Sequence, residues 1–174
     1  MFFTSQDFQF TKQLEAHWRD IREEVERLNS HDFIAWPEKF LYDGQGWDVF
    51  RLYANRQRIV KHCGMCPKTS ALLENIPGIV MAGFSSIAPN THIKPHRGSS
   101  DAVLRCHVGL IIPSDVGLRV GTETRIWQEG RCLIFDDTYE HETWNRSNRT
   151  RIILMIEFQK KVSTARLRNL QPVF

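Results

Sequence analysis

The sequence has no hydrophobic run long enough to cross a membrane. None of its apolar stretches approaches about 18 residues, the length at which a transmembrane helix becomes a candidate. Its first residues also lack a basic segment followed by an apolar one, so they do not resemble a secretory signal. We therefore expect a cytoplasmic protein with no membrane span.

Cysteine is scarce, and neither sign of charge is in large excess. The formal net charge of +3 is far from the concentrated basic surface of a nucleic-acid-binding protein, so no nucleic-acid partner is expected. A hydrophobic share of 41% and a charged share of 25% are typical of a soluble globular protein. A chain of 174 residues fits one domain with a sizeable core.

Two of the four cysteines form the pair Cys63-Gly-Met-Cys66. Such a pair can anchor zinc or act as a redox dithiol, but a structural zinc site normally needs four ligands. The other two, Cys106 and Cys132, do not form a second pair of this kind. We therefore favour thiols in a packed loop, with Pro67 opening a short helix over residues 67–75.

Residues 11–29 carry the strongest helical pattern. Their apolar residues recur at alternating steps of four and three, and they are Leu14, Trp18, Ile21, Val25 and Leu28. This spacing predicts one amphipathic helix packed on a core. A turn-rich link over residues 40–46 then precedes a half-buried strand over residues 47–53.

The remainder of the chain is rich in β-forming residues punctuated by proline and glycine. The expected strands are residues 79–87, 91–96, 103–112, 118–120, 125–127, 132–135, 141–145 and 152–158. Short strands with such turns predict an antiparallel sandwich or barrel, a class that includes the jelly-roll and cupin folds. We expect an all-β core with flanking helices (α+β) in one domain, 1–174. It comprises an N-terminal helical segment (1–46), a core (47–160) and a C-terminal tail (161–174).

Four of the seven histidines, His92, His96, His107 and His141, lie in the β-rich part. Neutral imidazole is the commonest metal ligand in proteins, and barrels of this class enclose ligand cavities. A lone histidine in a strand is usually structural, however. Spacing alone does not choose among the four.

Four longer motifs narrow the choice. They are FSSIAPNTHIKPHRG (84–98), LRCHVGLIIP (104–113), LRVGTETRIWQEGRCLIFDDTYEHETWN (118–145) and TRIIL (150–154). In order and spacing they resemble the catalytic region of the aspartyl/asparaginyl β-hydroxylase family. The upstream stretch CGMCPKTSALLENIPG (63–78) resembles the segment that precedes this region in many members.

The resemblance implies a double-stranded β-helix that binds iron(II) through His96 and His141. Most 2-oxoglutarate oxygenases carry an acidic residue two positions after the first histidine, which completes a facial triad. This chain has Gly98 there, and glycine at this position is characteristic of the family that it resembles. His92 matches the lead-in to the motif, and we expect it to support the loop rather than bind metal.

Three acidic residues near the motifs are candidates for a third ligand. We expect Asp136 and Asp137 to hold the turn before His141 instead, and Asp101 to be exposed to solvent.

The resemblance also implies a site for 2-oxoglutarate. This co-substrate chelates iron through its 1-carboxylate and 2-keto oxygens, which leaves its 5-carboxylate to be paired by a cation. The resemblance places Arg151 at that carboxylate and makes Ser85 a further donor, with Arg105 and His107 nearby. Strand alternation independently puts Arg105 and His107 on one face and Cys106, Val108 and Leu110 on the other.

The expected activity is that of an iron(II)- and 2-oxoglutarate-dependent dioxygenase that consumes O2 and forms succinate and CO2. Its substrate would be the β-carbon of Asp or Asn, in a peptide, a free amino acid or a related small molecule, although relatives also hydroxylate lipid acyl chains. Two alternatives stay open. One is a cupin-type metalloenzyme that needs no 2-oxoacid, and the other is a non-catalytic ligand-binding cupin.

Overall fold

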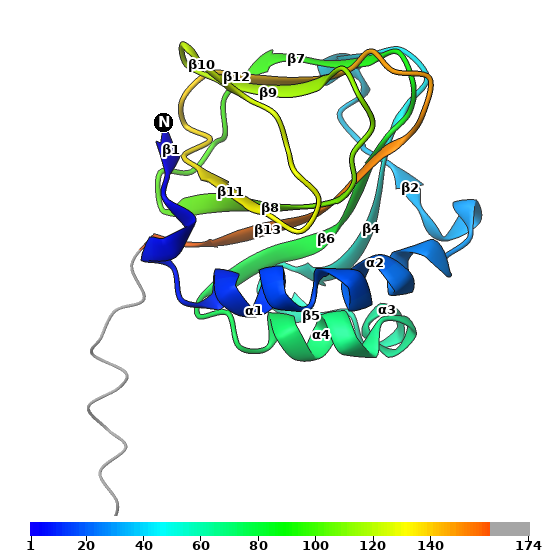
Figure 1. Cartoon of the computed structure of the whole chain (residues 1–174), viewed down its shortest axis with the longest axis vertical. Coiled ribbons are helices and arrows are strands. Elements are labelled where there is room, and N and C mark those ends of the chain that lie inside the picture. Colours follow the sequence, from blue (N-terminus) through cyan, green and yellow to red (C-terminus); the bar gives the residue numbers. More distant parts are fainter. Residues whose placement is uncertain (161–174) are drawn as a thin grey trace, which may run out of the picture.

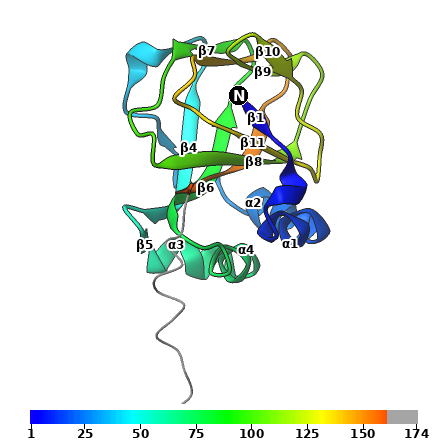
Figure 2. The ribbon, with the colours of Figure 1, turned by 90° about the vertical axis from the view of Figure 1, so that its left-hand side faces the viewer.

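The computed structural model describes residues 1–160, so the predicted tail, 161–174, lies outside the described residues. Two antiparallel β-sheets are stacked face to face, and the helices lie on the outer side of the larger sheet (Figures 1 and 2). The larger sheet has eight strands: β1 Phe2–Phe3, β2 Ile34–Ala35, β4 Trp47–Ala54, β5 Gln57–Arg58, β6 Ile79–Ile87, β8 Val103–Ile111, β11 Cys132–Phe135 and β13 Arg151–Gln159.

The smaller sheet has five strands: β3 Tyr42–Asp43, β7 Thr91–His96, β9 Val116–Val120, β10 Glu123–Arg125 and β12 His141–Asn145. The helices are α1 Phe10–Ala16, α2 Trp18–Glu26, α3 Val60–Met65 and α4 Pro67–Leu73, with 3-10 turns η1 Ser5–Asp7, η2 Ser30–Asp32 and η3 Lys39–Leu41. None of the helices in residues 1–160 combines the length and apolar character needed to cross a membrane.

The strand order identifies the fold. The large sheet runs β1-β11-β8-β13-β6-β4-β2, and the small sheet runs β10-β9-β12-β7-β3. Strands that are distant in sequence are therefore neighbours, as where β13 pairs with both β6 and β8. This is a jelly roll, or double-stranded β-helix, with flanking helices, and it confirms the predicted fold class.

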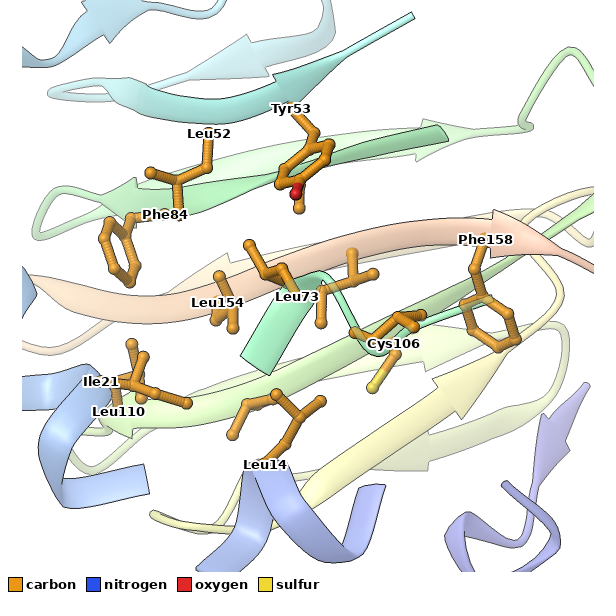
Figure 3. Close-up of a cluster of buried hydrophobic side chains, with 14 of the residues drawn as sticks. Leu14, Ile21, Leu52, Tyr53, Leu73, Phe84, Cys106, Leu110, Leu154 and Phe158 are labelled. Atoms are coloured by element: carbon orange, nitrogen blue, oxygen red, sulfur yellow. The ribbon is translucent and has the colours of Figure 1, made fainter. Parts of the chain in front are cut away.

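The predicted helix over residues 11–29 is two helices. His17 leaves the helical region with φ −107° and ψ 17°, which separates α1 from α2. The apolar stripe nevertheless behaves as expected, since Leu14, Ile21 and Val25 are buried against the outer face of the large sheet. Figure 3 shows Leu14 and Ile21 pointing from the helices toward side chains of that sheet.

Helix α4 begins at Pro67, as the sequence predicts, but Cys63 lies in a helix, α3, and not in a loop. The first turn of α4 is held by Glu24 of α2. The buried carboxylate of Glu24 accepts hydrogen bonds from the backbone N–H groups of Lys68 and Thr69, each at 2.8 Å, and from the Thr69 hydroxyl at 2.6 Å. Unpaired N–H groups at a helix start are thus satisfied from another helix.

Residues 34–43 bridge the edges of the two sheets. The β2 strand at one end of this segment pairs with β4 of the large sheet, and the β3 strand at the other end pairs with β7 of the small sheet. Between them, the ring of Trp36 stacks on the ring of Trp47 with centroids 4.2 Å apart. The predicted N-terminal segment therefore supplies strands to both sheets as well as helices.

Four of the eight strands predicted over residues 79–158 have the predicted bounds. Residues 79–87, 91–96, 132–135 and 141–145 are strands with identical limits. The strand predicted over residues 125–127 was wrong, because β10 is Glu123–Arg125. The apolar pattern there comes from Trp127, which leaves the strand and is buried in the core between the sheets.

Candidate active site

One pocket between the two sheets brings together the six site residues that the sequence predicts. Its lining includes Ser85, His96, Arg105, His107, His141 and Arg151. Four of them come from three adjacent strands of the large sheet, β6, β8 and β13, and the two others come from β7 and β12 of the small sheet. The remaining lining is largely apolar and aromatic, as in most small-molecule sites.

His96 and His141 are paired across the small sheet. They are direct partners in the register of β7 and β12, and their ring centroids lie 4.2 Å apart. Each Nδ1–H donates to a backbone carbonyl two residues earlier, that of Lys94 at 2.7 Å for His96 and that of Tyr139 at 3.0 Å for His141. These bonds fix the tautomer and leave both Nε2 lone pairs free, the arrangement that a metal requires.

Its buried environment also keeps His141 ready to bind a cation. Burial, and then the neighbouring His96, lower the pKa of His141 to about 4. The ring is therefore neutral at physiological pH and can donate its lone pair. No group of three or more His, Cys, Asp or Glu side chains is arranged as a metal site within residues 1–160, so the candidate ligands here are two histidines.

Asp137 fills the space beside Gly98. A Cβ placed on Gly98 would lie 2.3 Å from Cγ of Asp137, and the Gly98 N–H donates to the Asp137 carbonyl at 2.7 Å. The prediction that both aspartates hold the turn was right for Asp136, which accepts from the N–H and hydroxyl of Thr138. For Asp137 it was wrong, because its buried carboxylate accepts a hydrogen bond from Arg105 and its other oxygen, Oδ1, has no partner among residues 1–160.

Arg105 is held between two acids. Its Nε donates to Asp137 at 2.6 Å and its Nη2 lies 2.9 Å from Glu157, while its Nη1 lies 3.5 Å from the sulfur of Met155. The guanidinium is thus compensated within the protein. As predicted, Arg105 and His107 face the pocket, while Cys106, Val108 and Leu110 are buried on the helical side of the sheet.

Arg151 and Ser85 form the opposite end of the pocket. Arg151 is 2% exposed, and its Nη1 donates to the Ser85 carbonyl at 3.2 Å. The Ser85 hydroxyl accepts from the indole N–H of Trp47 at 3.0 Å, which leaves its own hydrogen free to donate. Burial lowers the pKa of Arg151, but the group is still protonated at neutral pH. This end is suited to a carboxylate.

His107 lies between the two ends with unused hydrogen-bonding capacity. Both of its ring nitrogens are buried without a partner among residues 1–160. Burial, followed by the charge of Arg151, lowers its pKa well below the ordinary value, so the ring is neutral. A buried imidazole without partners is costly, and a polar ligand in the pocket would satisfy it.

The other residues singled out from the sequence lie elsewhere. His92 Nε2 is 2.7 Å from Glu142 in a partly exposed pair away from the pocket lining. Asp101 is exposed, as expected. Cys63 and Cys66 are buried in the core between the helices and the large sheet, where the Cys63 thiol donates to the carbonyl of Leu52 at 3.3 Å.

Sequence reasoning missed Trp47, which lines the pocket, and also Asp137 and Glu157, which hold the pocket residue Arg105. Strand alternation contained the signal for two of them. Trp47 is two residues before Val49 on the inner face of β4, and Glu157 is six residues after Arg151 on the inner face of β13. The position of Asp137 beside Gly98 depends on packing between segments far apart in sequence, which no local pattern reports.

The comparison with protein families gives one match that covers most of the chain. The family described as aspartyl/asparaginyl beta-hydroxylase matches residues 15–161. Among curated relatives, the ornithine lipid ester-linked acyl 2-hydroxylase of Rhizobium tropici is 34% identical over 167 residues, which is 90% of this chain and 59% of that protein. The human aspartyl/asparaginyl beta-hydroxylase is 34% identical over 157 residues, 86% of this chain and 21% of that protein. The chain thus spans less than two thirds of the length of either relative.

A solved structure supports the fold. An oxidoreductase of the 2OG-Fe(II) oxygenase family from Burkholderia pseudomallei aligns with a TM-score of 0.60 over 87% of this chain and 91% of its own. At 11% identity, this likeness is one of architecture.

Proposed function

The chain belongs to the aspartyl/asparaginyl β-hydroxylase family, and from this membership we propose that it is an iron(II)- and 2-oxoglutarate-dependent hydroxylase. One observation carries the proposal. A pair of histidines whose Nδ1 atoms are bonded to backbone carbonyls lines the same pocket as Arg151, a buried arginine with no carboxylate partner among residues 1–160.

The residues present fit both groups. His96 and His141 would hold iron(II) through their Nε2 atoms, since both Nδ1 atoms are engaged by backbone carbonyls. Arg151 and Ser85 would bind the 5-carboxylate of 2-oxoglutarate, because the guanidinium offers a planar set of donors and the serine hydrogen is free. When bound, iron(II) and 2-oxoglutarate with O2 supply the oxidising power to hydroxylate an unactivated C–H bond.

The protein would contribute position and environment. Trp47 orients the Ser85 hydroxyl, and the neutral ring of His107 offers a hydrogen bond to the ligand between the two ends. Arg105, compensated by Asp137 and Glu157, adds no net positive charge beside the histidines. The apolar lining excludes water from the reacting carbon.

The substrate class rests on the relatives' names. They act on an aspartyl or asparaginyl β-carbon in one case and on a lipid acyl chain in the other. We propose an amino-acid, peptide or small-molecule β-carbon as the first substrate to screen, with acyl lipids second.

The test is succinate formation by protein purified without oxygen and then given iron(II), 2-oxoglutarate, ascorbate and air, with and without candidate substrates. His96→Ala and Arg151→Ala should abolish the iron-dependent succinate. Matched controls are His92→Ala, which removes a histidine outside the pocket, and Arg149→Ala, which removes an exposed neighbour of Arg151.

The alternative is a cupin that binds a ligand or metal without 2-oxoglutarate chemistry. It is favoured if no succinate forms and 2-oxoglutarate shows no iron-dependent binding by calorimetry. Binding without turnover, in contrast, would retain the co-substrate site and leave the substrate to be found.

A further inference from the structure

The guanidinium of Arg151 has little within the protein to balance its charge. No carboxylate in residues 1–160 forms a salt bridge with it, and its Nε is buried without a hydrogen-bond partner. Its protein partner is the Ser85 carbonyl, which accepts one bond from Nη1. An unpaired buried charge is strongly unfavourable, so another contact must hold this arginine in the pocket before a ligand arrives.

That contact is the face of Trp127. The indole lies on the connection between β10 and β11, is 2% exposed, and is packed in the core between the two sheets. Cζ of Arg151 stands 4.7 Å from its ring centroid. A cation at this distance from an indole is attracted by the negative face of the ring, most strongly where both groups are removed from water.

We infer that Trp127 is the positioning residue that holds Arg151 charged and in place, and that it thereby gives the pocket its preference for a 2-oxoacid with a distal carboxylate. The inference rests on the proposed function, because the ligand that Arg151 awaits is the 5-carboxylate of 2-oxoglutarate. It assigns to Trp127 a role that acts through Arg151 and not on the metal end of the pocket.

Replacing the indole of Trp127 should weaken 2-oxoglutarate binding because of what then occupies the space beside Arg151. A smaller aliphatic side chain leaves space beside the guanidinium, and water or an altered rotamer then fills it. The incoming carboxylate must displace that water or draw the arginine back, and both reduce affinity. A 2-oxoacid with an apolar tail makes no ion pair with Arg151, so the same substitution should affect its binding much less.

The test compares two ligands by calorimetry with protein loaded with Mn(II) in place of iron(II), so that binding is measured apart from turnover. One ligand is 2-oxoglutarate, and the other is 2-oxopentanoate, which has a methyl group in place of the distal carboxylate. Trp127→Leu should weaken 2-oxoglutarate binding about tenfold or more while changing 2-oxopentanoate binding little. Trp127→Phe, which keeps an aromatic face but has no indole N–H, should retain most of the preference.

A second measurement separates positioning from general damage. In an Arg151→Met background, Trp127→Leu should cause no further loss of 2-oxoglutarate affinity, because the group through which Trp127 acts is gone. Trp144→Leu is the matched control, since Arg146 lies 5.1 Å over that ring outside the pocket lining. This substitution should leave the affinities for both ligands unchanged.

Three outcomes would overturn the inference: equal weakening of both ligands, an unchanged preference in Trp127→Leu, or a loss in Trp127→Phe as large as in Trp127→Leu. The last would assign the effect to the indole N–H. If the wild-type protein binds no 2-oxoglutarate at all, the proposed function itself fails, and the two failures are thus distinguished.

Discussion

The carboxylate of Asp137 occupies the space in which a side chain at position 98 would begin. A Cβ on Gly98 would lie 2.3 Å from both Cγ and Oδ2 of Asp137. Gly98 stands where most 2-oxoglutarate oxygenases carry the acid of the facial triad. The space beside Gly98 is nevertheless occupied, because the carboxylate of Asp137 lies next to it. Asp137 is in turn fixed by Arg105.

Gly98→Ala should destabilise the protein and disturb the metal end of the pocket. The new methyl group must displace Asp137 and strain its ion pair with Arg105, for an expected loss of about 1–3 kcal/mol in the free energy of unfolding. Chemical denaturation of the metal-free protein measures it. Gly64→Ala is the control, because a Cβ there meets nothing within 4 Å and a helical alanine should instead stabilise by about 0.5–1 kcal/mol. Equal effects at both glycines would contradict the steric account.

Exchanging the acid between the two positions should raise metal affinity. The double variant Gly98→Asp with Asp137→Ala removes the obstruction and supplies a carboxylate two residues after His96, which would complete a facial triad. We expect it to bind Mn(II) more tightly than either the wild type or Asp137→Ala alone, as measured by calorimetry. Gly98→Asp by itself should not show this gain, since Asp137 still fills the space. If the double variant binds Mn(II) no more tightly than Asp137→Ala does, a side chain at position 98 does not point toward the two histidines.

Glu24→Ala should cost more stability than any ordinary surface substitution on α2. It leaves the partly buried N–H of Lys68, the buried N–H of Thr69 and the Thr69 hydroxyl without their acceptor, for an expected loss of about 2–4 kcal/mol. The adjacent Glu23→Ala removes an exposed pair with Arg27 and should change stability by less than about 0.5 kcal/mol. Denaturant midpoints of the two variants give the comparison, and similar midpoints would refute the role of Glu24 as the cap of α4.

The metal-free protein should lose stability as pH falls below 6.5, and His107 should account for part of the loss. Burial lowers the pKa of His107 well below its ordinary value of 6.5. Below pH 6.5 the unfolded chain therefore binds a proton that the folded chain refuses, which favours unfolding at up to about 1.4 kcal/mol per pH unit for one histidine. His141 adds to this slope until pH falls to about 4.

His107→Gln should reduce the loss of unfolding free energy per pH unit between pH 6.5 and about 4. The measurement is the free energy of unfolding at several pH values. His92→Gln serves as the control, because His92 is partly exposed and paired with Glu142. If His107→Gln loses unfolding free energy with falling pH as steeply as the wild type does, His107 is protonated in the folded protein.

Much of the fold could be predicted because its strands are punctuated locally. Proline and glycine flank the strands at residues 79–87 and 91–96, and Gly130 precedes the strand at residues 132–135; these bounds agree with the structure. The break at His17 could not be predicted, since the apolar stripe on either side of it keeps the same spacing. The pair Cys63 and Cys66 favoured a packed loop, whereas Cys63 lies in α3, which packs against β4.

Some residues of the candidate site could likewise be predicted from the sequence, and others could not. His96, His141, Ser85, Arg105, His107 and Arg151 were named through motifs, and the structure brings all six to one pocket. Asp137 was misplaced because its orientation depends on Gly98 and Arg105, which lie 39 and 32 residues away in the chain. The apolar pair Ile126-Trp127 predicts a strand, although β10 ends at Arg125 and Trp127 turns inward to Arg151.

The segment of residues 34–43 gives the two sheets a common boundary. Its ends supply a strand to β4 on one side and a strand to β7 on the other, so each of those strands has its outer row of backbone groups paired there. If this segment detaches, backbone amides in both sheets lose their hydrogen bonds, and with them their protection from hydrogen exchange, in a single event. The backbone amides of β4 and β7 that face this segment should then exchange hydrogen at one common opening rate. A protease cut within the segment would expose the unpaired edges of β4 and β7, which can pair with strands of other chains.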